Sequence, residues 1–260
     1  MSNAQIKMIR KLAQKKFRNE LKLFVAEGLR LCEEVPPTQI EFGLFTREFL
    51  SDTRAAALIE RLKNFAPLEE VAPSTFEKIS DTQTPQGILL VVRQKVLTLE
   101  EVLRKKIIVA LDGVQDPGNV GTILRTAEAF GCAVVMLDGS AEIFNPKVVR
   151  SSMGAIFYVP AALATRAEFL QATSGIELLA AAVDSSAEIY WRHDFTDKQS
   201  AIVFGSEAFG VSKEILDVAQ KIFIPMSGRA ESLNVATSAA IILSEAVRQA
   251  TQVMGDFNIH

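Results

Sequence analysis

Five polar side chains in three stretches of the sequence have the types expected of a site that positions its reactants. They are Asn119, Arg125, Glu207, Ser232 and Asn234. Amide and hydroxyl groups orient a substrate, and an arginine, whose pKa lies above about 12, stabilises negative charge rather than accepting a proton. The set suits a reaction that needs positioning more than it needs a strong acid or base.

One of these residues lies in a glycine-rich turn. The stretch GSEAFGVS at 205–212 has two glycines five positions apart and a following serine, as phosphate-binding loops do, but Val211 replaces the lysine that would bind a β- or γ-phosphate. A dinucleotide site is also incomplete, because the segment DPGNVG contributes only Gly118 and Gly121. The sequence argues against both kinds of phosphate site.

Other common catalytic centres lack their residues. A serine hydrolase needs a G-x-S-x-G elbow, and the sequence has none. The two histidines, His193 and His260, do not lie near the polar loops, and we interpret both as surface residues. Cys32 and Cys132 are far apart and are expected to be reduced core thiols. No group of His, Cys, Asp and Glu has metal-ligand spacing, so no metal is expected.

The polar loops follow apolar strands that alternate with helical patterns. From residue 107 onward, near-continuous apolar runs such as IIVAL at 107–111 predict strands. Helices are predicted at 119–131, at 146–153, at 165–173, after Ser212 and from Ser232 to about Ala250. Apolar strands joined by helices indicate an α/β fold with a parallel sheet covered on both faces. Because ligands bind beyond the carboxyl ends of such strands, the loops DGVQDPGN, GSEAFG and PMSGRAESLN should hold the chemistry.

The start of the chain predicts a smaller α/β domain. Apolar positions from Ile6 to Phe24 recur at helical spacing and predict one helix with a basic outer face. Strands are expected at IEFGLF, LEEVA and GILLVV, and helices at RAAALIERLKNF and STFEKIS. A polar connector follows. We therefore divide the chain into a first domain at 1–95, a linker at 96–106 and a second domain at 107–260.

Composition and charge exclude several protein classes. The chain of 260 residues is 48% hydrophobic and 23% charged, as globular proteins are. Its net charge of −3 gives no overall attraction to nucleic acid, so the basic first segment stands out locally. No apolar run approaches the roughly 20 residues of a membrane span, and the first residues lack the apolar core of a secretory signal. We expect a cytoplasmic protein that does not enter a membrane.

Three segments, taken in order, resemble the motifs of the SpoU (TrmH-type) RNA 2′-O-ribose methyltransferases of the SPOUT superfamily. They are NVGTILRTAEAFG at 119–131, IVFGSEAFGVS at 202–212 and IPMSGRAESLNVATSAAI at 224–241. The resemblance covers about residues 107–250, and PKVVRSSMGA at 146–155 is similar to the family's segment between the first and second motifs. The first domain resembles the ribosomal-protein-like α/β domain that binds substrate in these enzymes.

The resemblance implies a fold, a cofactor and an assembly. It implies a deep trefoil knot in the second domain, S-adenosylmethionine as cofactor and a homodimer. The family's functional positions fall on the five polar residues named above, and its cofactor contacts fall on Gly205, Gly210, Ile224, Met226 and Leu233. Two residues depart from the family's second motif, because Ala208 replaces a usual glycine and Phe209 a commonly polar residue.

The implied activity is methyl transfer from S-adenosylmethionine to a ribose 2′-hydroxyl of RNA. We expect Arg125 to lie beside the ribose or its phosphate and Glu207 to orient Arg125. Asn119 would brace the helix start, while Ser232 and Asn234 would place the arginine or the nucleotide.

The expected partner is RNA, and the first domain favours ribosomal over transfer RNA. We expect phosphate contacts from Lys15, Lys16, Arg18 and Arg150. The alternative is an RNA-binding or ribosome-associated protein on a methyltransferase scaffold that has lost catalysis. The complete set of five polar residues argues against that loss.

Overall fold

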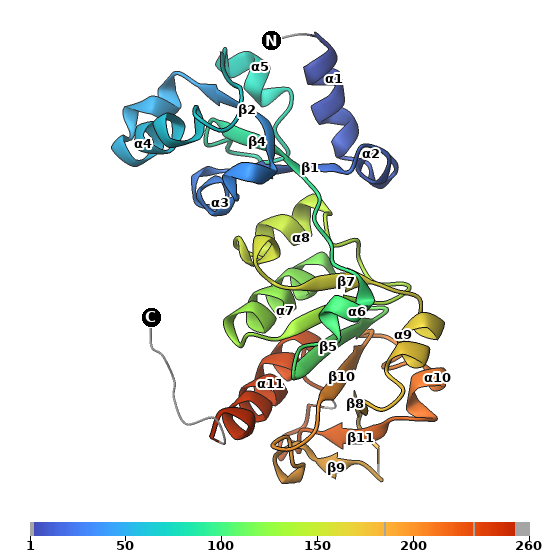
Figure 1. Cartoon of the computed structure of the whole chain (residues 1–260). Coiled ribbons are helices and arrows are strands. Elements are labelled where there is room, and N and C mark those ends of the chain that lie inside the picture. The colour runs from blue at the N-terminus through green and yellow to red at the C-terminus, as the bar shows by residue number, and fades with distance from the viewer. Residues whose placement is uncertain (1–2, 185, 231, 253–260) are drawn as a thin grey trace. The chain divides into compact units, whose positions relative to one another are not determined.

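The computed structural model describes residues 3–184, 186–230 and 232–252, which form two compact units (Figure 1). The first unit contains the residues up to Lys95 together with the segment 142–157. The second unit contains residues 96–141 and the chain from Tyr158 onward. No helix in the described ranges is long and apolar enough to cross a membrane.

A four-stranded mixed sheet with the order β1-β4-β2-β3 forms the centre of the first unit. The strands are β1 (Leu23–Glu27), β2 (Ile40–Thr46), β3 (Leu68–Val71) and β4 (Ile88–Arg93). The helices are α1 (Asn3–Leu12), α2 (Lys15–Leu21), α3 (Leu29–Glu34), α4 (Thr53–Leu62) and α5 (Pro73–Glu77), with short 3-10 turns η1 (Pro37–Gln39) and η2 (Glu48–Ser51). Strand β4 is antiparallel to both β1 and β2, whereas β3 is parallel to β2. The predicted small α/β fold is confirmed.

The prediction of one helix from Ile6 to Phe24 is wrong. Gln14 is extended and separates α1 from α2, and Lys22 adopts a left-handed conformation that ends α2. Phe24 therefore lies in β1, where it is buried and its ring centre lies 4.9 Å from that of Phe144. The apolar spacing fits a helix, but burial of Phe24 in a sheet determines the local structure.

The segment 142–157 packs within the first unit through apolar and ionic contacts. It contains α8 (Pro146–Ser151) and the turn η3 (Ala155–Phe157). Phe144 and Phe157 both lie against the ring of Phe24. Glu142 forms an ion pair with Arg18, whose side chain is 3% exposed. A segment distant in sequence thus completes the core around β1.

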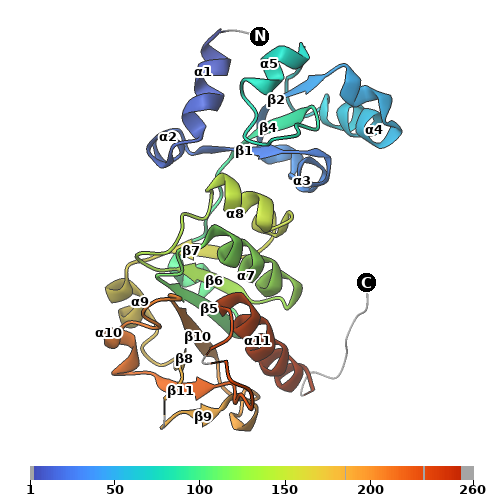
Figure 2. The same ribbon diagram turned by 180° about the vertical axis from the view of Figure 1, so that it is seen from behind.

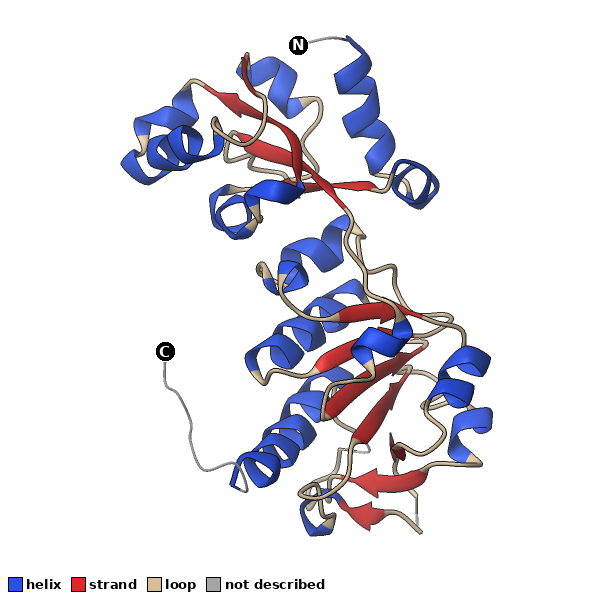
Figure 3. Ribbon diagram, in the orientation of Figure 1, coloured by secondary structure: helices blue, strands red, loops and turns tan. Residues whose placement is uncertain are grey.

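The second unit contains a seven-stranded, all-parallel sheet with the order β7-β6-β5-β10-β8-β11-β9 (Figure 3). The strands are β5 (Ile107–Asp112), β6 (Ala133–Met136), β7 (Ala161–Leu163), β8 (Glu177–Ala181), β9 (Glu188–Ile189), β10 (Ser200–Gly205) and β11 (Gln220–Phe223). The helices are α6 (Leu99–Val102), α7 (Pro117–Ala129), α9 (Arg166–Ala172), α10 (Lys213–Leu216) and α11 (Val235–Gln252), with the turn η4 (Tyr190–Arg192). The prediction of a parallel α/β sheet is confirmed, and the trefoil knot stays a prediction.

Helices cover both faces of this sheet, which explains why its strands β5, β6 and β10 are largely apolar. Alternate residues of β5, Ile108 and Ala110, share a core cluster with Phe169 of α9 and Ile215 of α10. Helices α7 and α11 pack side by side on the opposite face (Figures 1 and 2). With both faces buried, neither can be polar.

Two features of this unit were not predicted. The short edge strands β7 and β9 carry too few residues for a clear apolar pattern. Part of the polar connector also forms α6, which begins with a capping box in which Thr98 and Glu101 each accept from the other's backbone N–H. Val102 of this helix is fully buried in the core of the second unit.

The two cysteines are free and buried, which confirms the prediction of core thiols. Burial raises the pKa of Cys132 to about 12 and also raises the pKa of Cys32. Both side chains are therefore neutral thiols at physiological pH.

Candidate cofactor and substrate site

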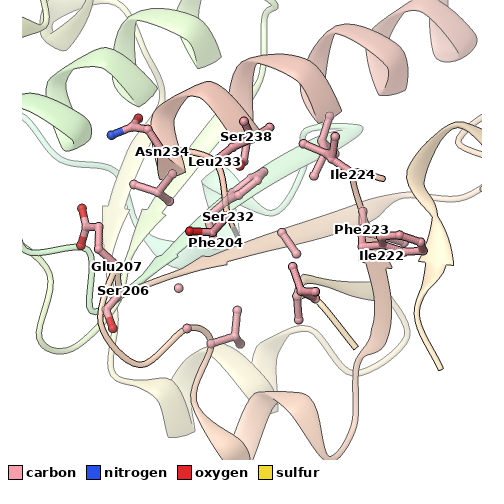
Figure 4. A pocket seen from close by; sticks show the side chains of 18 of the residues that line it. Phe204, Ser206, Glu207, Ile222, Phe223, Ile224, Ser232, Leu233, Asn234 and Ser238 are labelled. Carbon is pink, nitrogen blue, oxygen red and sulfur yellow. The ribbon is translucent and has the colours of Figure 1, made fainter. Parts of the chain in front are cut away.

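A cavity of about 510 Å³ opens beyond the carboxyl ends of β8, β10 and β11. All five positions predicted to contact a cofactor line it: Gly205, Gly210, Ile224, Met226 and Leu233. Glu207, Ser232 and Asn234 line it as well. Figure 4 shows Glu207 and Asn234 on one side of the cavity and Ile222 and Ile224 on the other. The loops predicted to hold the chemistry therefore meet here, while the role of each residue stays a prediction.

The turn after β10 brings backbone atoms very close together. Ser206 and Gly210 exchange two backbone hydrogen bonds of 3.0 and 2.9 Å, and the Ser206 hydroxyl accepts a third from the N–H of Phe209 at 3.0 Å. A Cβ on Gly205 would lie 2.0 Å from the carbonyl carbon of Gly210. Gly210 itself has a φ of +67°. Both glycines are thus required by the shape of this turn.

Three polar side chains from different motifs form a hydrogen-bonded chain at the cavity. The Asn119 amide donates to Oε1 of Glu207 at 2.6 Å. The Asn234 amide donates to Oδ1 of Asn119 at 2.9 Å. Asn234 also accepts from the N–H groups of Ala236 and Thr237, so it caps the start of α11. One network therefore joins the loops after β5, β10 and β11.

The structure assigns the cap of α7 differently from the sequence analysis. Asp116, rather than Asn119, accepts the backbone N–H at the start of the helix, at 2.8 Å from the nitrogen of Asn119. The Asn119 side chain is consequently available to bridge Glu207 and Asn234.

Arg125 lies apart from this network. It sits on the exposed face of α7 with Thr122 and is not among the residues that line the cavity. Glu207, which was expected to orient Arg125, is bonded to Asn119 instead. Within the described ranges the side chain of Arg125 has no hydrogen bond or ion pair, and its exposed guanidinium keeps its donors available.

A buried carboxylate that the sequence analysis missed anchors the same region. Asp112, the last residue of β5, has a side chain that is 1% exposed. It accepts from Nε of Arg166 at 2.6 Å and from the backbone N–H of Ser212 at 2.7 Å. The Ser212 bond holds the chain directly after the glycine turn. The sequence contained a signal for Asp112, because this acidic residue ends the otherwise apolar run IIVALD.

The predicted RNA contacts differ in their availability. Lys15 and Lys16 are exposed on α2, as a phosphate contact requires. Arg150 forms an ion pair of 2.9 Å with Asp81 and keeps 34% of its side chain exposed.

The prediction that Arg18 contacts RNA is corrected by the structure. The side chain is buried, pairs with Glu142 and donates to the carbonyl oxygens of Leu12 and Ala13 at 2.8 Å each. Arg18 therefore stabilises the first unit and is not free to bind phosphate.

The interpretation of His193 as a surface residue is also wrong. The side chain is 6% exposed, and its two ring nitrogens lie 3.1 Å from oxygens of Glu177 and Glu188. Its ring meets Phe195 edge-on, with 4.7 Å between centres. Neither of these two glutamates is among the residues that line the cavity. His260 lies outside the described residues.

Two family models match the chain, in the order of its two predicted domains. The model of the SpoU rRNA Methylase family matches residues 106–244, more than half of the chain. The model of the MRM3-like substrate binding domain matches residues 3–90. The chain belongs to the SpoU rRNA methylase family. This membership confirms the resemblance inferred from the three motifs.

Individual SpoU relatives match over nearly the whole chain. The 23S rRNA (guanosine(2553)-2′-O)-methyltransferase RlmP of Bacillus subtilis is 34% identical over 93% of this chain and 95% of its own length. The AdoMet-bound rRNA methyltransferase of Sinorhizobium meliloti superposes with a TM-score of 0.83 at 30% identity, covering 95% of each chain. The SpoU methyltransferase AviRb of Streptomyces viridochromogenes, solved in complex with AdoMet, superposes with a TM-score of 0.84 at 25% identity, covering 98% of this chain and all of its own.

The cavity has the chemistry that S-adenosylmethionine requires. Apolar side chains such as Phe204, Ile222 and Ile242 form much of its wall and suit an adenine ring. Hydroxyl groups of Ser232 and Ser238 also line it and suit ribose and amino-acid groups. The close backbone turn at Gly205 leaves no space for a side chain there. Among the described residues, no group of three potential metal ligands is present.

Proposed function

We propose that this SpoU protein transfers a methyl group from S-adenosylmethionine to a ribose 2′-hydroxyl of ribosomal RNA. The observation that carries the proposal is the bonded chain of Asn119, Glu207 and Asn234 at a cavity lined by all five predicted cofactor contacts. RlmP and the RlmB enzyme of Acinetobacter baylyi, which are named as 23S rRNA 2′-O-methyltransferases, support ribosomal RNA as the substrate.

The residues of the site contribute by holding groups in place. S-adenosylmethionine, when bound, supplies a methyl group on a positively charged sulfur. Gly205, Gly210 and Leu233 would hold it through backbone groups, joined by Ile224 and Met226. Because the network fixes the carboxylate of Glu207, this group can accept a hydrogen bond from a ribose hydroxyl without reorganising. Ser232 and Asn234 would orient the nucleotide from the opposite loop.

Arg125 would neutralise the negative charge that develops on the ribose oxygen or remains on its phosphate. Its exposure and its lack of a partner in the described parts of the chain support this role, since a paired guanidinium could not bind an incoming anion. Arg125 does not line the cavity, so the substrate would have to bring its ribose or phosphate to α7.

The remaining expectations complete the proposal. Exposed Lys15 and Lys16 would contact RNA phosphates, and Arg150 would do so after leaving Asp81. We further propose a homodimer, a trefoil knot in the second unit and a cytoplasmic location, in keeping with SpoU membership.

The proposed function is tested by methylation of ribosomal RNA from cells that lack this protein. Labelled S-adenosylmethionine should deliver methyl groups to one or a few riboses, which mapping of 2′-O-methyl positions identifies. Failure to bind S-adenosylmethionine in calorimetry, together with intact RNA binding, would instead support a scaffold without catalysis.

Replacement of Arg125 by alanine tests its assigned role. We expect Arg125→Ala to lower methylation at least 100-fold while leaving cofactor affinity unchanged, because the guanidinium is not on the cavity wall. The matched control is Arg104→Ala, since Arg104 is an exposed arginine that pairs with Glu100 on the surface of the same unit. Normal turnover by Arg125→Ala would refute the role.

A further inference from the structure

Phe209 is an aromatic side chain that the protein holds in solvent. Its exposed fraction is 91%, higher than that of Val183 at 72% or Val218 at 66%. Exposed apolar residues occur singly on most proteins and need no explanation by themselves. Phe209 differs from such a residue because of the turn that carries it and because of its position beside the cavity.

The backbone of Phe209 is firmly held. Its N–H donates to the Ser206 hydroxyl at 3.0 Å, and Ser206 and Gly210 close the turn through two further hydrogen bonds. Gly205 packs so tightly behind the turn that even a Cβ would overlap it. A ring on such a turn loses little backbone entropy when it binds a partner, which favours recognition.

The same turn carries Glu207 toward the proposed ribose site. Phe209 and Glu207 both line the cavity, and since they are two positions apart, their Cα atoms are at most about 7.6 Å from each other. Figure 4 shows Glu207 and Ser206 at this edge of the cavity. A nucleobase is bonded directly to its ribose, so a ribose held at Glu207 brings its own base, or that of a neighbouring nucleotide, within reach of Phe209.

We propose that Phe209 is a positioning residue on which a nucleobase of the RNA substrate stacks beside the methylated ribose. Unpaired RNA bases commonly stack on aromatic side chains, and each such contact contributes about 1–3 kcal/mol. The inference rests on the proposed function and adds the group that recognises the base. A contact with a second copy of the chain is less well supported, because the neighbours of Phe209 in the turn, Glu207, Ala208 and Gly210, are polar or small.

Substitutions that separate aromatic from merely apolar character test the proposal. We expect Phe209→Ala and Phe209→Leu to raise the KM for RNA by about 5- to 100-fold, as loss of one stacked base predicts, and Phe209→Trp to stay within a few-fold of the original protein. Trp191→Ala, at an exposed aromatic residue of the second unit that lies outside the cavity, should have no effect. Equal activity of the Ala, Leu and Trp variants would overturn the proposal.

A binding measurement without the cofactor provides a readout independent of turnover. The chain has one tryptophan, so Phe209→Trp combined with Trp191→Phe places a single indole at the turn. We expect substrate RNA to quench its fluorescence, whereas RNA should not quench the original protein, whose single indole at Trp191 lies outside the cavity. Absence of quenching while RNA binds would refute stacking.

Two further measurements distinguish other partners of the ring. Calorimetry should give the same cofactor affinity for Phe209→Ala as for the original protein. Sedimentation equilibrium should show the same self-association for both proteins. A weaker cofactor affinity would show that the ring covers the cofactor, and weaker self-association would show that it contacts a second copy. Either result with an unchanged KM for RNA overturns the proposal. If the original protein itself methylates no RNA, the proposed function fails, which differs from a failure confined to Phe209.

Discussion

The two ends of β10 carry polar clusters of opposite character. At the amino end, Ser200 bonds to Glu177, and this carboxylate also faces the buried ring of His193. At the carboxyl end, Glu207 is bonded to half-buried Asn119 but is itself exposed and lines the cavity. One strand thus connects a closed polar cluster with an open one.

This difference distinguishes polar groups that stabilise the fold from polar groups that can bind a ligand. A buried cluster must satisfy its own polar groups, because water cannot replace a missing partner. An open cluster can leave hydrogen-bonding capacity for a ligand, and changing it leaves little unsatisfied in the protein. We therefore expect changes at the amino end to affect folding and changes at the carboxyl end to affect turnover.

Between the two clusters, the larger effect on turnover is expected from Glu207 at the open end. Glu207→Ala removes the acceptor proposed for the ribose and the partner of Asn119, so kcat should fall on the order of 100-fold. Thermal unfolding should change little, because Glu207 is exposed. Glu214→Ala, at an exposed carboxylate on α10, is the matched control. A loss of stability as large as that of a buried-cluster variant would break the comparison.

A smaller effect, on stability rather than turnover, is expected at the closed end. His193→Ala leaves Glu177 and Glu188 without their shared partner and opens space beside Phe195, so the free energy of unfolding should fall by about 1–3 kcal/mol. Denaturant titration measures this loss. Cofactor affinity of the folded variant should be unchanged, and a selective loss of affinity would show that the two ends are coupled.

The smallest effect concerns acid stability at the open end. The Ser186 hydroxyl, the Lys221 ammonium and the Ser186 N–H hold the pKa of Asp184 below its usual range. Because its pKa is lower in the folded state, ionised Asp184 stabilises the protein at pH values above about 3.9, the ordinary pKa of aspartate. This stabilisation is lost as the pH falls further. Unfolding midpoints of Asp184→Asn and the original protein should therefore differ at pH 6, and the difference should shrink progressively as pH falls below about 3.9. A constant difference would contradict this assignment.

The sequence was sufficient to predict the parallel sheet of the second unit and the convergence of its loops at one edge of that sheet. Continuous apolar strands require helices on both faces, and parallel strands direct their following loops to one edge. The loops that line the cavity were consequently predictable, whereas the individual cofactor positions came from the resemblance to the SpoU motifs. The bond between Asn119 and Glu207 was not, because it joins residues 88 positions apart and depends on side-chain geometry.

Burial of charged side chains was the least predictable property. Arg18 lies among exposed lysines in the sequence, and only the partner Glu142, far along the chain, makes its burial possible. His193 is a similar case, since its partner Glu177 lies 16 positions away in β8. Local sequence patterns contain no information about such distant partners.

The membership of residues 142–157 in the first unit has a practical consequence for dissecting the protein. The chain changes unit at three places, after residues 95, 141 and 157, so neither unit is one continuous stretch of sequence. A fragment that starts at Val96 would carry Phe144 without Phe24, the ring it packs against. A shortened first unit would lack Glu142 and leave the buried guanidinium of Arg18 without its counter-ion. Cutting at the apparent linker would therefore yield two incomplete fragments with exposed apolar surface. Joining residues 142–157 to the first fragment through a flexible linker would restore the contacts of Phe24 and Arg18.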